Sequence, residues 1–164
     1  MGFTLKEIQN RNAGDKNYLL YVSSFPGFTL DLFRFDFTVD HHYNYRLRFS
    51  YFDPKIKVPR KPDFYCEGIL SGSIKEILQK FILQDLNDIY AYNSPNAGKY
   101  VPDDIGHYSY KIKNGSDFLG ATLYYPNPSH IERFENNTGK QFYNLHCKIV
   151  EWIESLYGFI KEQQ

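Results

Sequence analysis

The sequence predicts one α+β domain, residues 1–164, built on a mostly antiparallel sheet of about five to seven strands. Apolar and polar residues alternate through 30–39 and again through 45–52, on both sides of a short polar break. A second alternating region contains the turn signal Asn114-Gly115, and two other stretches repeat apolar residues at helical spacing. The first two patterns are typical of hairpins, and the third predicts helices that cover one face of the sheet.

The length and composition fit a globular protein. A chain of 164 residues suits one domain, and 42% hydrophobic with 23% charged residues is ordinary for such a domain. The aromatic content is high, with 15 Tyr and 14 Phe. Most of these rings suit strands and a core, although some Tyr side chains could line a binding surface.

The N-terminal segment reads as a short helix followed by a strand. Thr4 and Glu7 have the spacing of a capping box, which predicts a helix beginning near Phe3. The sequence 18–23 is then predicted to form a buried strand.

The hairpin of residues 30–52 has a definite predicted register. Leu30 and Leu32 fall on even positions, which predicts a bulge near Leu32. From Phe33 the apolar residues fall on odd positions, as they do in the returning strand, so odd positions must face odd positions to keep one buried face. Asp36 should therefore lie opposite Arg46 or Arg48.

The middle of the chain predicts a strand over 64–70 and a helix over about 73–90. Ser73 and Glu76 have capping-box spacing and mark the expected start of this helix. Its apolar stripe consists of Ile74, Ile77, Leu78, Phe81, Ile82, Leu86, Ile89 and Tyr90.

A long irregular loop, 93–106, precedes the second hairpin, 108–125, and loops of that length are often functional. In this hairpin, Tyr108, Tyr110 and Ile112 should share a face with Leu119, Ala121 and Leu123.

The C-terminal part predicts two helices. Ser129 to Glu132 begins a helix that should stop near Gly139, and a C-terminal helix follows over about 140–161. Its stripe is Phe142, Leu145, Ile149, Trp152, Ile153, Leu156 and Ile160.

Histidines are the natural candidates for catalysis. His107 follows Asp103 and Asp104, and a carboxylate could orient its imidazole as a general base. His146 lies on the apolar stripe of the last helix and is expected to bond a backbone carbonyl at the edge of the core. The adjacent pair His41-His42 has no further ligand at metal-binding spacing, so no metal site is predicted.

Other motifs of enzymes are missing from the sequence. It has no glycine-rich phosphate loop, no nucleophile elbow and no dinucleotide fingerprint, and we predict no cofactor. Cys66 and Cys147 are expected to be free thiols. The chain shows neither a signal-peptide pattern nor an apolar run long enough to span a membrane, which predicts a cytoplasmic protein.

These features favour a non-enzymatic protein-binding domain, of which an immunity-type inhibitor of a toxin enzyme is one concrete form. The formal net charge is zero, which disfavours a dedicated nucleic-acid binder. Acidic and tyrosine-rich positions in and beside the long loop form the predicted binding surface: Tyr92, Tyr100, Asp103, Asp104 and Tyr108.

Two other functions stay open. The chain could be a small hydrolase or transferase that uses His107 with Asp103 or Asp104. It could also be a ligand-binding module that stacks sugars or bases on exposed Tyr side chains. The second face of the sheet could be exposed to solvent, or it could form the interface of a homodimer.

Overall fold

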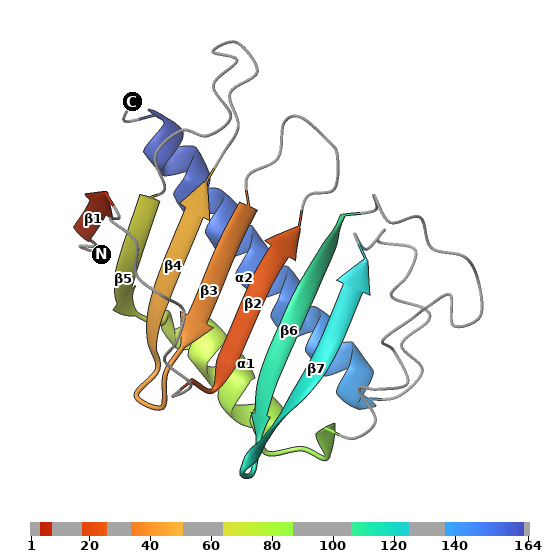
Figure 1. The fold of residues 1–164 in the computed structure, drawn as a ribbon. Coiled ribbons are helices and arrows are strands. Elements are labelled where there is room, and N and C mark those ends of the chain that lie inside the picture. Colours follow the sequence, from red (N-terminus) through yellow and green to blue (C-terminus); the bar gives the residue numbers. More distant parts are fainter. Residues whose placement is uncertain are drawn as a thin grey trace.

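In the part of the chain that the structure describes, seven strands form one antiparallel sheet in the order β1-β5-β4-β3-β2-β6-β7 (Figure 1). The structure is a computed structural model, and it describes residues 4–7, 18–25, 34–50, 64–86, 106–124 and 137–162. The elements are β1 Thr4–Glu7, β2 Leu20–Phe25, β3 Arg34–Val39, β4 Asn44–Ser50, β5 Phe64–Ile69, α1 Gly72–Ile82, β6 His107–Asn114, β7 Asp117–Tyr124 and α2 Asn137–Glu162.

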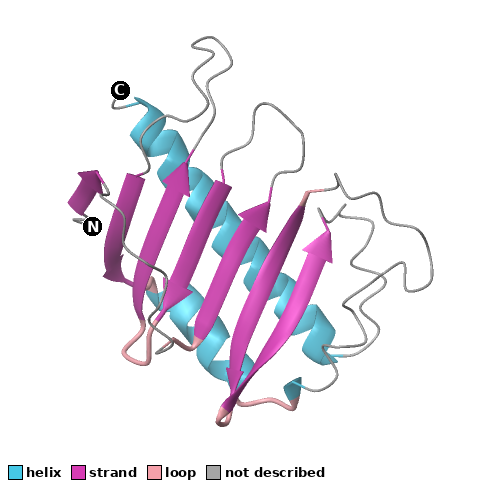
Figure 2. Cartoon of the chain, viewed as in Figure 1, coloured by secondary structure: helices cyan, strands magenta, loops and turns pink. Residues whose placement is uncertain are grey.

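Both helices lie on the same face of the sheet (Figure 2). We call this the inner face and the opposite side the outer face. The antiparallel sheet with two helices confirms the predicted α+β class. Because the helices cover one face only, the alternating side chains of each strand separate into a core set and an outer set.

The register of the β3–β4 hairpin agrees with its prediction. Phe37 lies opposite Leu47, and Asp36 lies opposite Arg48. Phe37 and Leu47 are fully buried on the inner face. A shift of one residue would have moved these side chains to the outer face, so the burial of apolar residues fixes the register.

The β6–β7 hairpin also has the predicted shared face, since Tyr110 pairs with Ala121 and Ile112 with Leu119. Its turn lies one residue later than the Asn114-Gly115 signal. Asn114 is the last residue of β6, and Gly115 and Ser116 form the two-residue loop. Gly115 has φ +62°, as the first central position of a type II′ turn requires.

The predicted N-terminal helix is wrong, because Thr4–Glu7 forms β1 and pairs with β5. Leu5, for example, lies opposite Cys66. A helix this short gains few internal hydrogen bonds, whereas four extended residues can satisfy the edge of β5 with ladder hydrogen bonds.

The middle helix is shorter than predicted and begins earlier. α1 starts at Gly72 with Ser71 as its N-cap residue, so Ser73 belongs to the first turn and does not cap the helix. The helix ends at Ile82, where the amide of Gln84 donates to the carbonyl of Phe81 at 3.1 Å. This tighter turn still buries Leu86 in the core, which explains why the apolar spacing continues past the helix. Residues 87–90 lie outside the described part.

The C-terminal helix is confirmed, but the predicted break at Gly139 is not. α2 extends from Asn137 to Glu162 and includes Gly139 in its first described turn. A glycine costs least near the end of a helix, where the backbone groups lack partners within the helix in any case. The helix predicted to begin at Ser129 lies outside the described residues.

The core lies between the inner face and α2, which runs diagonally behind the strands in Figure 1. Toward one end of α2, Phe142 packs against Phe81 and Tyr110, with ring centroids 5.9 and 5.0 Å apart. Further along, Trp152 contacts Phe37 and Tyr45 at 5.7 and 4.8 Å. One helix therefore connects β6 with β3 and β4. Neither described helix is long and apolar enough to cross a membrane.

Candidate functional site

The outer face carries rows of polar and aromatic side chains that the register aligns across the strands. Arg46 of β4 lies opposite Thr38 of β3, Thr38 lies opposite Tyr21 of β2, and Tyr21 lies opposite Lys111 of β6. These four residues form the centre of a row that continues from Arg46 to Glu67 of β5 and from Lys111 to Gly120 of β7. Three consecutive strands and the distant β6 thus bring a guanidinium, a hydroxyl, a phenol and an ammonium into one line.

Charged side chains on the outer face differ in their exposure to solvent. Arg34, Arg46 and Lys111 are exposed, whereas Asp36 and Glu67 are half-buried, as are Arg48 and Lys113. The exposed charges of the described outer face are therefore cationic.

Both half-buried carboxylates accept hydrogen bonds from tyrosines of the same face. The hydroxyl of Tyr21 donates to Oδ1 of Asp36 at 2.9 Å, and that of Tyr65 donates to Oε2 of Glu67 at 2.5 Å. Partial burial, together with the neighbouring Asp36, raises the pKa of the Tyr21 phenol. The Tyr21 phenol therefore stays protonated at neutral pH and remains a donor to Asp36.

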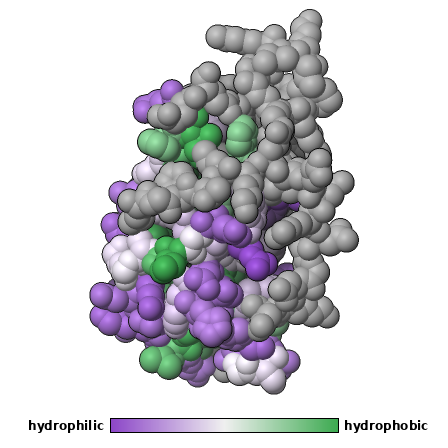
Figure 3. Space-filling model, turned by 90° about the vertical axis from the view of Figure 1, so that its left-hand side faces the viewer, coloured by the Kyte–Doolittle hydropathy of each residue, from purple (hydrophilic) through white to green (hydrophobic). Residues whose placement is uncertain are grey.

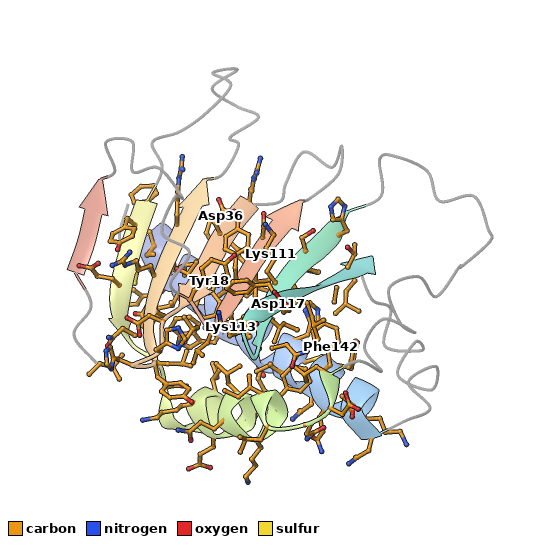
Figure 4. The ribbon with its side chains drawn as sticks, turned by 60° about the horizontal axis from the view of Figure 1, so that its bottom comes forward. Tyr18, Asp36, Lys111, Lys113, Asp117 and Phe142 are labelled. Atoms are coloured by element: carbon orange, nitrogen blue, oxygen red, sulfur yellow. The ribbon has the colours of Figure 1, made fainter. Side chains whose placement is uncertain are left out.

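An aromatic cluster adjoins the row. The ring of Tyr18 lies 5.9 Å from that of Tyr21 and 4.8 Å from that of Phe118. Lys111 Nζ is 6.0 Å from the centroid of the Tyr21 ring, and Lys113 Nζ is 4.7 Å from that of Phe118. In Figure 4, Tyr18, Asp36, Lys111 and Lys113 gather over the sheet, while Phe142 lies on the helix side. Two lysine ammonium groups thus lie over rings of this aromatic cluster.

A second group of polar side chains lies in the core. His146 of α2 is 3% exposed, and its Nδ1 is hydrogen-bonded to the hydroxyl of Tyr110, 2.5 Å away. This corrects the expectation of a backbone carbonyl partner. The rings of Tyr108 and Tyr143 also surround the imidazole, at 4.6 and 6.0 Å. Burial lowers the pKa of His146 to about 4, so the imidazole is neutral at physiological pH.

Both cysteines are free, as predicted. Cys66 is buried, with its Sγ 3.3 Å from the hydroxyl of Tyr45, and Cys147 is half-buried. Burial raises the pKa of both thiols. A thiol that stays protonated is a poor nucleophile, so these environments fit structural cysteines.

The predicted site residues are only partly placed. Tyr92, Tyr100, Asp103 and Asp104 lie outside the described residues, so the acidic loop surface stays a prediction. Tyr108 is half-buried on the inner face, where its ring lies 6.1 Å from that of Phe35 as well as against His146.

The catalytic candidate His107 begins β6 at the end of the outer face, where it pairs with Phe25 and Tyr124. Its proposed carboxylate partners belong to the undescribed loop. The histidines His41 and His42 are exposed in the β3–β4 turn. Within the described ranges, no three His, Cys, Asp or Glu side chains come together as a metal site would require.

Exposed apolar side chains are scattered among the described elements. Ile69, Leu83 and Phe159 are the large exposed ones, and they come from β5, the turn after α1, and α2. Figure 3 shows the side of the molecule nearest β1, where the coloured residues are mostly hydrophilic and apolar ones form small separate spots. The described surface therefore points to polar recognition more than to a broad apolar interface.

Comparisons with known proteins give no family for this chain. No protein-family model matches it, and no curated protein matches it either.

The sequence pattern predicts which side chains of the row face away from the core, but it does not predict that they lie side by side. Tyr21, Arg46 and Lys111 are the polar positions between buried apolar ones, so alternation predicts that each points away from the core. Their alignment depends on β6 pairing with β2, a contact between distant segments that alternation does not specify.

Proposed function

We propose that this chain is a non-enzymatic protein-binding domain that recognises its partner through the outer face of the sheet. An immunity-type inhibitor of a toxin enzyme is one form that such a domain can take.

The observation that supports this proposal is the continuous row Arg46–Thr38–Tyr21–Lys111 on a face that neither α1 nor α2 covers. Two residues of the row, Tyr21 and Arg46, are of types that are enriched at protein interfaces. Strand spacing gives seven strands of six residues an area of about 30 Å by 20 Å. That size is comparable to one side of a standard protein interface.

A site-specific photo-crosslinking experiment tests the proposal. The photoreactive amino acid p-benzoylphenylalanine replaces Thr38, at the centre of the row, and in a separate variant replaces Lys80, which is exposed on α1. Both variants are expressed in the native cells, illuminated, purified under denaturing conditions and analysed by mass spectrometry.

The expected result is one protein captured in high yield from position 38 but not from position 80. Capture of the same set of proteins from both positions would show that contact at position 38 is not specific. Capture from neither position would contradict recognition through this face.

A further inference from the structure

On the outer face, the carboxylates Asp36 and Glu67 are half-buried, whereas Arg34, Arg46 and Lys111 are exposed. Asp36 and Glu67 are half-buried and accept tyrosine hydroxyl groups, so part of their hydrogen-bonding capacity is already used within the sheet. Arg46 and Lys111 are exposed, and within the described residues neither makes an ion pair with a carboxylate. A molecule that approaches this face meets cations first.

These two cations have a fixed relation to each other. In the central row, Thr38 and Tyr21 lie between Arg46 and Lys111, and the row continues beyond Arg46 to Glu67 of β5 and beyond Lys111 to Gly120 of β7. Three strand spacings separate their Cα atoms by about 14 Å. An extended chain that crosses the strands covers this distance in about four residues.

The middle of the row offers contact area that is already ordered. Tyr21 is held by its hydrogen bond to Asp36 and by ring contact with Tyr18, and Lys111 Nζ lies 6.0 Å from the centroid of its ring. A side chain that is immobilised before binding loses little entropy when the partner arrives. This stretch of the row therefore combines a preorganised aromatic centre with an exposed cation on each side of it.

We propose that the partner of the outer face contributes an acidic segment, with carboxylates that pair with Arg46 and Lys111 and a backbone that lies across Tyr21. This inference rests on the protein-binding function proposed above and adds the chemistry of the partner. Charge complementarity of this kind accelerates association and selects against partners of the wrong sign.

Two features favour an acidic protein over a single-stranded nucleic acid, which would also pair with cations and stack on rings. The formal net charge of the chain is zero, whereas nucleic-acid-binding domains usually have a basic excess. Lys111 and Lys113 lie over the rings of Tyr21 and Phe118, where stacked bases would have to displace them.

A displayed library of random twelve-residue peptides is the probe, selected on the immobilised full-length protein. We expect the enriched peptides to be rich in Asp and Glu, with acidic residues about four positions apart. Isothermal titration then compares the best peptides on the wild-type protein and on the variants Arg46→Glu, Lys111→Glu and Lys80→Glu. The Lys80→Glu variant reverses an exposed charge on α1 and serves as the matched control.

Each outer-face reversal should weaken peptide binding about tenfold or more, whereas Lys80→Glu should leave it unchanged. Circular dichroism and thermal melting of each variant show that the fold is retained. Both changes are at exposed positions, but Arg46→Glu places a carboxylate opposite Glu67, so Arg46→Gln is measured beside it as a neutral variant.

Other outcomes distinguish a failure of the acidic-partner inference from a failure of the proposed protein-binding function. Peptides that bind the outer face without acidic enrichment, and with equal affinity for Arg46→Glu, would overturn the acidic partner but keep protein binding. A selection that enriches nothing would contradict both proposals. Tighter binding of fluorescein-labelled U20 RNA than of any peptide, lost in Lys111→Glu, would replace the partner with a nucleic acid.

Discussion

Acidification should destabilise this protein through His146, the buried imidazole between α2 and β6. Its pKa is about 4 in the fold, against an ordinary value of 6.5, because burial disfavours the charged ring. The neighbouring side chains Tyr108, Tyr110 and Tyr143 are uncharged phenols at neutral pH, so no carboxylate close to the ring is described that would stabilise an imidazolium. Between pH 6.5 and 4 the unfolded chain takes up a proton at this position that the folded chain does not.

The size of the pH effect on the free energy of unfolding follows from the two pKa values of His146, in the folded and in the unfolded chain. The contribution of neutral His146 to the free energy of unfolding is fully present above pH 6.5. It is lost as the pH falls toward 4. The full difference between the two pKa values corresponds to ~3 kcal/mol of unfolding free energy. About 2 kcal/mol of this should already be lost at pH 5.

Urea unfolding at several pH values between 7.5 and 5 measures this effect in the wild type and in the His146→Gln variant. Glutamine keeps a polar group near Tyr110 but does not titrate, so the variant should have a flatter dependence of stability on pH. Other titrating groups are common to both proteins, and the difference in slope isolates His146.

Equal slopes in the two proteins would refute this reasoning. If His146→Gln does not fold, an NMR titration of the wild-type imidazole gives the same information. A pKa of 6 or more for His146 would show that water or a carboxylate reaches the ring.

Further predictions concern single side chains, each measured by urea unfolding at pH 7. Gly68→Ala should destabilise the protein by about 1–3 kcal/mol, because a Cβ there would lie 3.1 Å from the Tyr45 ring, and a native stability would contradict that close contact. Gly115→Ala should cost about 1 kcal/mol, because φ +62° strains a side chain. Gly158→Ala should instead stabilise by about 0.5–1 kcal/mol, since it lies in α2 with open space around it; a loss would indicate a hidden clash. Asp40→Ala should cost about 1 kcal/mol, because its carboxylate accepts two backbone amides of the β3–β4 turn; no change would mean that water replaces them.

Local patterns predicted the hairpins and the helix stripes because one buried face fixes them. The alternation around Phe37 and Leu47 allows one register only if both side chains are to be buried, and Asp36 then follows opposite Arg48. The spacing of Phe142, Leu145 and Ile149 likewise determines which side of α2 meets the sheet.

Local sequence patterns do not predict which distant segments pair with one another or where each helix and strand ends. Thr4 and Glu7 have a spacing that suits a capping box, but β5 offers these residues a ladder that sequence spacing does not reveal. His146 and Tyr110 were both expected to face the core, yet their hydrogen bond depends on how α2 crosses β6. The candidate site could not be predicted from the sequence either, because its central row forms only when β6 pairs with β2.

The order of the strands also bears on how the chain folds. β2, β3, β4 and β5 follow one another both in the sequence and in the sheet, so their pairings close modest loops. The β2–β6 pairing joins Val22 to Tyr110, and it must close a much longer loop before its contacts compensate the lost entropy. We expect the β2–β6 pairing to form late in folding. A binding surface centred on Tyr21 and Lys111 would therefore be completed only when the last two strands dock, which keeps half-folded chains from presenting it.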